Sequence, residues 1–136
     1  MRPQPEDIEP MVQEGVKQAI ELAKDNGITL DYSDDSIKEV EKMLGELHDD
    51  YKKNGEQEGF SGLMLMLAFY IGEVIRQKGL GGKWERNHPQ FGEDSFPFYW
   101  RGKTLFIFGW CQKRVFDGDG DDVWFKYQVS VIQFLQ

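Results

Sequence analysis

Residues 59–84 constrain the fold of this 136-residue chain more than any other segment. Residues 63–71 are nine consecutive apolar residues, so a helix formed here is apolar on every side and has to be buried on several sides. Nine residues fall well short of the roughly 20 that a membrane-spanning helix needs. A glycine-rich turn at residues 79–82 ends the segment. The segment therefore predicts a central, buried helix that begins near Phe60.

Small residues recur inside this helix, at Gly62, Ala68 and Gly72. Glycine weakens a helix by about 1 kcal/mol relative to alanine, so two glycines inside one helix indicate a packing reason. We expect them to allow another helix to approach closely.

Two amphipathic helices are predicted before the central one, over residues 6–25 and 34–53, because apolar residues recur there at spacings of three and four. Pro10 fits only in the first turn of the first helix, and Ser33 is a good N-cap for the second. The buried stripe expected for the second helix is Ile37, Val40, Met43, Leu44, Leu47 and Tyr51. Its solvent side is expected to carry Glu39, Glu41, Lys42, Glu46, Asp49 and Asp50. Residues 1–5, with two prolines, are expected to fray.

After residue 82 the pattern changes to short extended stretches. Residues 83–86 predict a strand, and residues 96–100 and 103–107 flank an Arg101-Gly102 turn that predicts a hairpin. Residues 110–116 suit a short helix. The alternation and the β-propensity of residues 123–133 favour a strand, and a helix capped by Asp121 or Asp122 is the alternative. The sequence thus predicts a single α+β domain over residues 1–136, with three N-terminal helices and a small antiparallel sheet.

Charge and composition exclude several classes of function. The formal net charge is −8 and the pI about 4.7, so the surface repels nucleic-acid phosphates and anionic lipids. We expect binding to neither nucleic acid nor membrane. The only cysteine, Cys111, rules out an internal disulfide and suits a reducing compartment. The N-terminal segment has no apolar core of a signal peptide, and we expect a cytoplasmic protein.

Three sequence blocks resemble a group of uncharacterised bacterial domains. They are the block LDYSxxSI at residues 30–37, the block YIGEVIR with GGxW at residues 70–84, and the block FGWCQKR at residues 108–114. The group includes domains of unknown function and immunity-type proteins that are encoded near toxins. The resemblance implies a C-terminal helix over residues 123–133 and implies no catalytic residue.

The candidate chemical groups are few and scattered. Glu73 follows Gly72 in the most apolar helix, where a carboxyl can have a raised pKa, but pairing with Arg76 or Lys83 is the simpler interpretation. Cys111 has no histidine near it in sequence. His48, expected at the solvent edge of its helix, and His88 are too far apart for a zinc site, and we expect no metal or cofactor.

The acidic run at residues 117–122 fails as an EF-hand loop. Its sixth position is Asp122 in place of glycine, and its twelfth is Gln128 in place of glutamate. Residues 79–83 lack the spacing and the position of a phosphate-binding loop. Both segments are interpreted as turns.

The preferred hypothesis is a non-enzymatic, immunity or antitoxin-like module whose partner is a protein, for instance a toxin. Its binding face is predicted to include exposed aromatic and acidic residues, namely Trp100, Trp124, Asp119 and Asp121. One alternative is a small enzyme or ligand-binding domain with a pocket near Glu73, Arg76, Trp84 and Cys111. Another is a structural subunit of a homo-oligomer.

Overall fold

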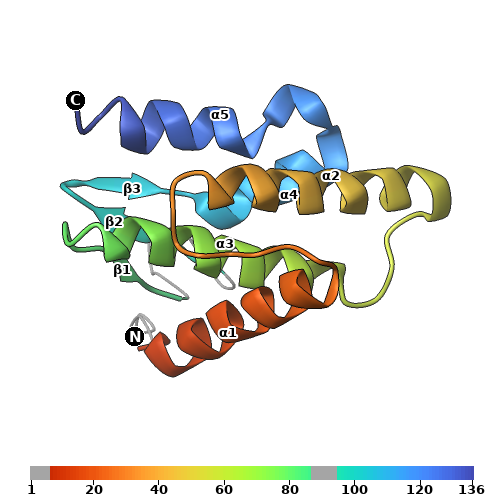
Figure 1. Ribbon diagram of the computed structural model, residues 1–136, viewed down its shortest axis with the longest axis horizontal. Coiled ribbons are helices and arrows are strands. Elements are labelled where there is room, and N and C mark those ends of the chain that lie inside the picture. Colours follow the sequence, from red (N-terminus) through yellow and green to blue (C-terminus); the bar gives the residue numbers. More distant parts are fainter. Residues whose placement is uncertain (1–6, 87–94) are drawn as a thin grey trace, which may run out of the picture.

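The computed structural model describes residues 7–86 and 95–136, which form an α+β fold (Figure 1). The helices are α1 (Glu9–Asp25), α2 (Ser36–Asn54), α3 (Phe60–Gln77), α4 (Ile107–Asp117) and α5 (Val123–Tyr127). The strands are β1 (Lys83–Trp84), β2 (Phe98–Trp100) and β3 (Lys103–Leu105). A 3-10 turn, Asp119–Asp121, precedes α5, and a π-helical turn, Gln128–Ile132, continues it. The expected three N-terminal helices and small sheet are confirmed. His88 lies outside the described residues.

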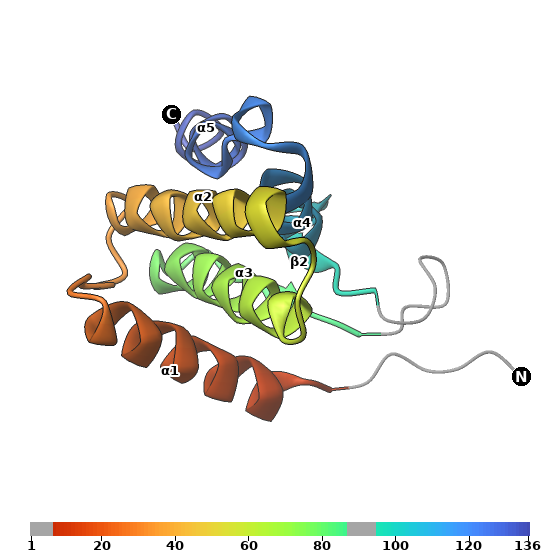
Figure 2. The ribbon, with the colours of Figure 1, turned by 90° about the vertical axis from the view of Figure 1, so that its right-hand side faces the viewer.

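Helix α3 lies at the centre, between α1 and α2 (Figures 1 and 2), and it also contacts α4. Most of its residues are buried, including an unbroken run from Met66 to Ile75. The prediction of a central buried helix is therefore confirmed. None of the helices in the described ranges is long and apolar enough to cross a membrane.

The glycines of α3 have a different role from the predicted helix–helix contact. A Cβ atom on Gly72 would lie 2.6 Å from Nε1 of Trp84, so the bare backbone makes room for the indole that follows the helix. Gly62 faces open space, with no atom within 4 Å of such a Cβ. Of the two glycines in α3, only Gly72 is required by packing. The group that packs on it is Trp84 of the following strand, and not another helix.

The α1–α2 connection explains why α2 begins two residues later than predicted. Ser33 accepts a hydrogen bond from the backbone N–H of Ser36 on its Oγ at 3.1 Å, and its carbonyl accepts another from the Ser36 hydroxyl at 2.6 Å. Residues 33–36 therefore form a hydrogen-bonded turn of their own, and Asp35 occupies the N-cap position in place of Ser33. Pro10 lies in the first turn of α1, as expected.

The strands form one antiparallel sheet in the order β1-β2-β3. Trp84 pairs with Phe98, and Trp100 pairs with Lys103 across the hairpin. Arg101 and Gly102 both have positive φ, 51° and 79°, as in the tight turns that suit hairpins. The predicted strand over residues 103–107 is two residues too long, because Ile107 is already the first residue of α4 and is fully buried there.

The C-terminal segment is helical, as the sequence blocks implied. Val123, Tyr127 and Val131, spaced by four, are all fully buried, whereas Phe125 and Val129 are 64% and 45% exposed. A strand would place all five on one face, so burial separates the two interpretations. Asp122 caps the helix by accepting a hydrogen bond from the N–H of Phe125 at 2.9 Å.

Candidate functional site

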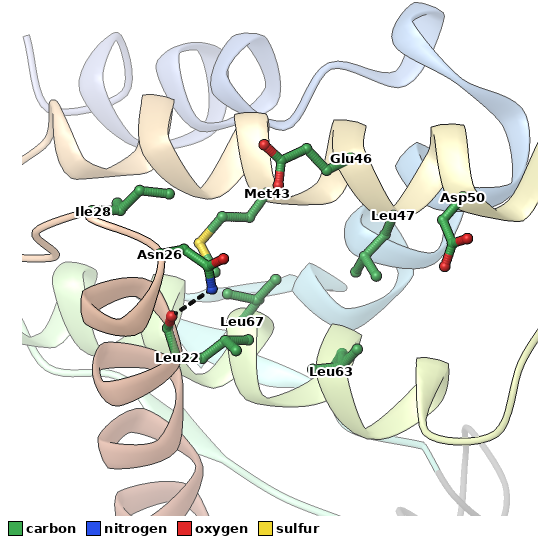
Figure 3. Close-up of a pocket in the computed structure, with 9 residues that line it drawn as sticks. All are labelled: Leu22, Asn26, Ile28, Met43, Glu46, Leu47, Asp50, Leu63 and Leu67. Atoms are coloured by element: carbon green, nitrogen blue, oxygen red, sulfur yellow. Dashed lines mark hydrogen bonds between the residues drawn. The ribbon is translucent and has the colours of Figure 1, made fainter.

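A groove opens where the C-terminal end of α1, the middle of α2 and the first half of α3 meet (Figure 3). We call it the α1–α2–α3 groove. It encloses about 240 Å³ and is lined by Leu22, Asn26, Ile28, Met43, Glu46, Leu47, Asp50, Leu63 and Leu67. Met43 and Leu67 are buried, and the other aliphatic side chains of the lining are partly exposed.

Helical spacing places these side chains together. Leu63 and Leu67 are one turn apart on α3, and Met43 and Leu47 are one turn apart on α2, so each helix presents a short apolar ridge. Helix α1 ends beside them, where the side-chain amide of Asn26 donates a hydrogen bond to the Leu22 carbonyl at 2.9 Å. The chain then turns at Gly27, which has a positive φ of 75°, and the groove is partly open to solvent.

The rim of the groove is acidic. Glu46 and Asp50 are one turn apart on α2, beside the ridge of Met43 and Leu47. Asp50 accepts a hydrogen bond from the Asn54 amide at 2.7 Å, and Glu46 has no ion-pair partner within residues 7–86 and 95–136. No lysine or arginine is among the lining residues. The groove thus combines an apolar floor with one-sided negative charge.

Glu73 and Arg76 form a partly buried ion pair. Arg76 donates to Glu73 at 2.9 Å and to Glu9 at 2.5 Å, and the Gln13 amide donates to Glu73 at 3.4 Å. Burial lowers the pKa of Arg76, whereas the hydrogen bonds to Glu9 and Glu73 and their negative charges raise it. The carboxylates have the larger combined effect, so the pKa of Arg76 lies above its ordinary value. The cluster ties the start of α1 to the end of α3, which is the structural role expected for Glu73.

The predicted pocket of Glu73, Arg76, Trp84 and Cys111 is brought together only in part. Trp84 packs on Gly72, and the Arg76 side chain packs beside Gly82, so these residues share the C-terminal end of α3. Cys111 is fully buried in α4, where Lys126 and Glu41 are the charges that act on it. Burial raises the pKa of its thiol far above the ordinary value, which makes it a poor nucleophile.

The predicted aromatic and acidic face is divided in the same way. Trp100 is only 1% exposed, so the prediction that it lies on the surface is wrong. Its ring centre lies 5.4 Å from that of the exposed Phe134. Asp119 is exposed. Asp121 forms an ion pair with Lys126 at 3.1 Å. Trp124 is partly exposed and has the Lys38 ammonium 5.0 Å from its ring centre.

Sequence reasoning missed the most buried ion pair among the described residues. Arg114 is 8% exposed, and its Nε donates to both carboxylate oxygens of Glu41 at 2.9 Å. Glu41 also accepts from the N–H of Val123 at 3.0 Å, so the prediction that it faces solvent is wrong. The signal was present in α4, where Arg114 lies three residues after Cys111 and beside Val115, on the apolar face.

His48 is also more enclosed than expected. Its Nδ1 lies 2.7 Å from the carbonyl oxygen of Val115, which joins α2 to α4. It borders a second hollow, of about 580 Å³, lined by His48, Asp49, Lys52, Arg114, Phe116, Asp117, Gly118 and Asp119. Two cations and three carboxylates share this lining, so it favours no single class of ligand. The described ranges contain no group of three or more His, Cys, Asp and Glu side chains placed to hold a metal ion.

Comparison with protein-family models, with curated proteins and with solved structures finds no match for this chain. The three sequence blocks nevertheless have packing roles in the structure. In the first block, the Ser36 hydroxyl and the N–H of Tyr32 lie 2.7 and 2.9 Å from the buried hydroxyl of Tyr70. The second block supplies the contact of Gly72 with Trp84, and the third supplies Arg114.

Proposed function

We propose that this chain is a non-enzymatic protein-binding module, an immunity or antitoxin-like factor of a bacterium, that holds its partner in the α1–α2–α3 groove. The observation that carries the proposal is the groove itself, with its apolar floor and acidic rim. Exposed apolar surface that is rimmed by polar residues is typical of protein–protein interaction sites. The net charge of −8 favours a basic partner.

The size of the groove supports a protein ligand over a cofactor. Pockets for small molecules usually measure roughly 300–1,000 Å³ and enclose most of the ligand. The groove measures about 240 Å³ and is partly open to solvent, which suits one or two inserted side chains.

The surface around Asp121 and Trp124 is the weaker binding site. Lys126 neutralises Asp121, and Lys38 lies against the Trp124 ring. The carboxylate and the aromatic ring that were expected to contact a partner therefore already interact with lysines of the same chain. In the groove, by contrast, Glu46 is exposed and Leu22, Leu47 and Leu63 are partly exposed.

The test is co-expression with the products of the genes next to its own, followed by co-purification and by assays of protection against a toxic product. We expect one neighbouring protein to bind and to be inhibited. Leu63→Gln, in the groove, is expected to abolish both effects. Leu65→Gln is the matched control, because Leu65 is also a partly exposed leucine of α3 but does not line the groove. No binding by any neighbour, or equal loss with both variants, contradicts the proposal.

A second candidate function is that of a structural subunit in a homo-oligomer. Phe125 and Val129, one turn apart, are 64% and 45% exposed on the outer side of the C-terminal helix. Apolar side chains exposed together on one face favour self-association. Light scattering of the wild type and of Phe125→Ser/Val129→Ser tests it. A strict monomer in both samples removes this function.

A further inference from the structure

We infer that the segment bound in the α1–α2–α3 groove is a basic amphipathic helix, with two apolar side chains one turn apart and lysine or arginine beside them. The inference rests on the proposed function and specifies the chemistry of the partner. Two apolar ridges line the groove, and two carboxylates, Glu46 and Asp50, stand on its rim.

The ridges favour a helix as the bound element. Met43 and Leu47 on α2, and Leu63 and Leu67 on α3, are both pairs with i, i+4 spacing (Figure 3). Side chains of a third helix at i and i+4 have the same spacing of about 6 Å along the helix axis and fit between two such ridges. From Met43 to Asp50 the α2 wall covers about two turns, which accommodates one pair of anchors.

The rim selects positive charge on the partner. Glu46 and Asp50 also have i, i+4 spacing, so two basic side chains one turn apart on the bound helix can each face a carboxylate. The walls contributed by α1 and α3 add no charged side chain to the lining. An acidic helix would meet repulsion there, and an anionic lipid surface would meet the same repulsion.

Two synthetic 18-residue peptides test the inference. Both have leucine at i, i+3, i+4 and i+7 spacings; one has lysine and the other has glutamate at its remaining positions. Binding is followed by amide chemical shifts of the ¹⁵N-labelled protein. We expect the lysine peptide alone to bind, to shift the amides around Leu22, Leu47 and Leu63, and to become helical on binding.

Matched charge reversals locate the effect. Glu46→Lys/Asp50→Lys is expected to weaken binding of the lysine peptide about tenfold, because both rim interactions become repulsive. Glu14→Lys/Asp119→Lys changes the net charge equally at exposed positions outside the groove, and we expect less than a twofold change. Binding that weakens equally in both variants indicates nonspecific attraction and overturns the inference.

The remaining outcomes separate this inference from the proposed function. If a neighbouring gene product binds in a manner sensitive to Leu63→Gln while the lysine peptide does not bind the groove, the function stands and the basic helix is wrong. If the glutamate peptide binds instead, the inferred charge is wrong. If the lysine peptide binds the groove but no neighbouring protein does, the groove chemistry stands and the immunity-like function is wrong.

Discussion

At the scale of single residues, Arg114 is a buried cation that forms its ion pair with Glu41. Its guanidinium is held by Glu41, which also accepts a hydrogen bond from the first residue of α5. One carboxylate thereby joins α2, α4 and α5. Removing one partner of a buried ion pair leaves the other charged and unsolvated, which costs much more than losing an exposed pair.

Glu41→Ala is therefore expected to lower the free energy of unfolding by about 3 kcal/mol. Glu39→Ala is the matched control, because Glu39 lies on the same helix and pairs with Lys42 at 3.7 Å near the surface. That change is expected to cost less than about 0.5 kcal/mol. Urea denaturation measures both. Equal losses in the two variants contradict the structural role assigned to Arg114.

Cys111 gives a prediction for alkaline pH. Burial raises the pKa of its thiol in the folded protein above its ordinary value of 9.0, which the unfolded chain retains. The thiol's contribution to stability is thus complete below pH 9 and is lost as the unfolded thiol ionises at higher pH. Between pH 8 and pH 10 the wild type should lose about 1.4 kcal/mol more stability than Cys111→Ala does. If the stabilities of the two proteins fall in parallel as the pH rises, the folded thiol ionises as easily as the unfolded one, which contradicts the prediction.

At the scale of elements, the contact between α3 and β1 depends on one missing side chain. Gly72 lets the indole of Trp84 lie against the helix backbone, and Trp84 then packs edge-on to Phe69, with ring centres 5.0 Å apart. The indole is buried between the helix and the sheet, so it has little room to move. The sheet is therefore positioned by a glycine inside a helix.

Gly72→Ala is expected to destabilise the fold by about 2 kcal/mol, because its Cβ would overlap the indole. Gly62→Ala, in the same helix, meets open space and is expected to stabilise by about 0.5 kcal/mol through helix propensity. Thermal unfolding of both variants checks the pair. A neutral Gly72→Ala would mean that Trp84 has room to move.

At the scale of the whole molecule, the C-terminal segment packs against helices that come much earlier in the chain and closes one side of the core. Val123, Tyr127 and Val131 are fully buried, and α5 contacts α2. The Tyr127 hydroxyl donates to Asp34, which also pairs with Lys78 at 2.8 Å. The last layer is thus joined to the α1–α2 connection and to the end of α3.

Deleting residues 123–136 is expected to prevent cooperative folding. Each of the three buried side chains contributes about 1.5–3 kcal/mol, which together rivals the 5–15 kcal/mol stability of a typical domain. Deleting only residues 133–136, which are exposed, should retain the fold. Dispersion of amide signals and the near-UV circular dichroism distinguish the two. A folded 1–122 fragment would show that the core closes without the C-terminal helix.

The sequence by itself determined the elements that local periodicity controls. The apolar run of α3, the stripes of α1 and α2 and the Arg101-Gly102 turn each follow from neighbouring residues, and all appear in the structure. The helical C-terminus was different. Its alternation suited a strand, and only packing decided which of its apolar residues face the core.

The tertiary structure alone decided the buried ion pair and the groove. Glu41 and Arg114 are 73 residues apart in the chain, and the groove collects side chains from α1, α2 and α3. Leu47 and Leu63 follow the same periodic pattern as core residues, so the sequence does not show that they border an opening. Periodicity reports which side of a helix is apolar, whereas the angles at which helices pack decide how much of that side is covered.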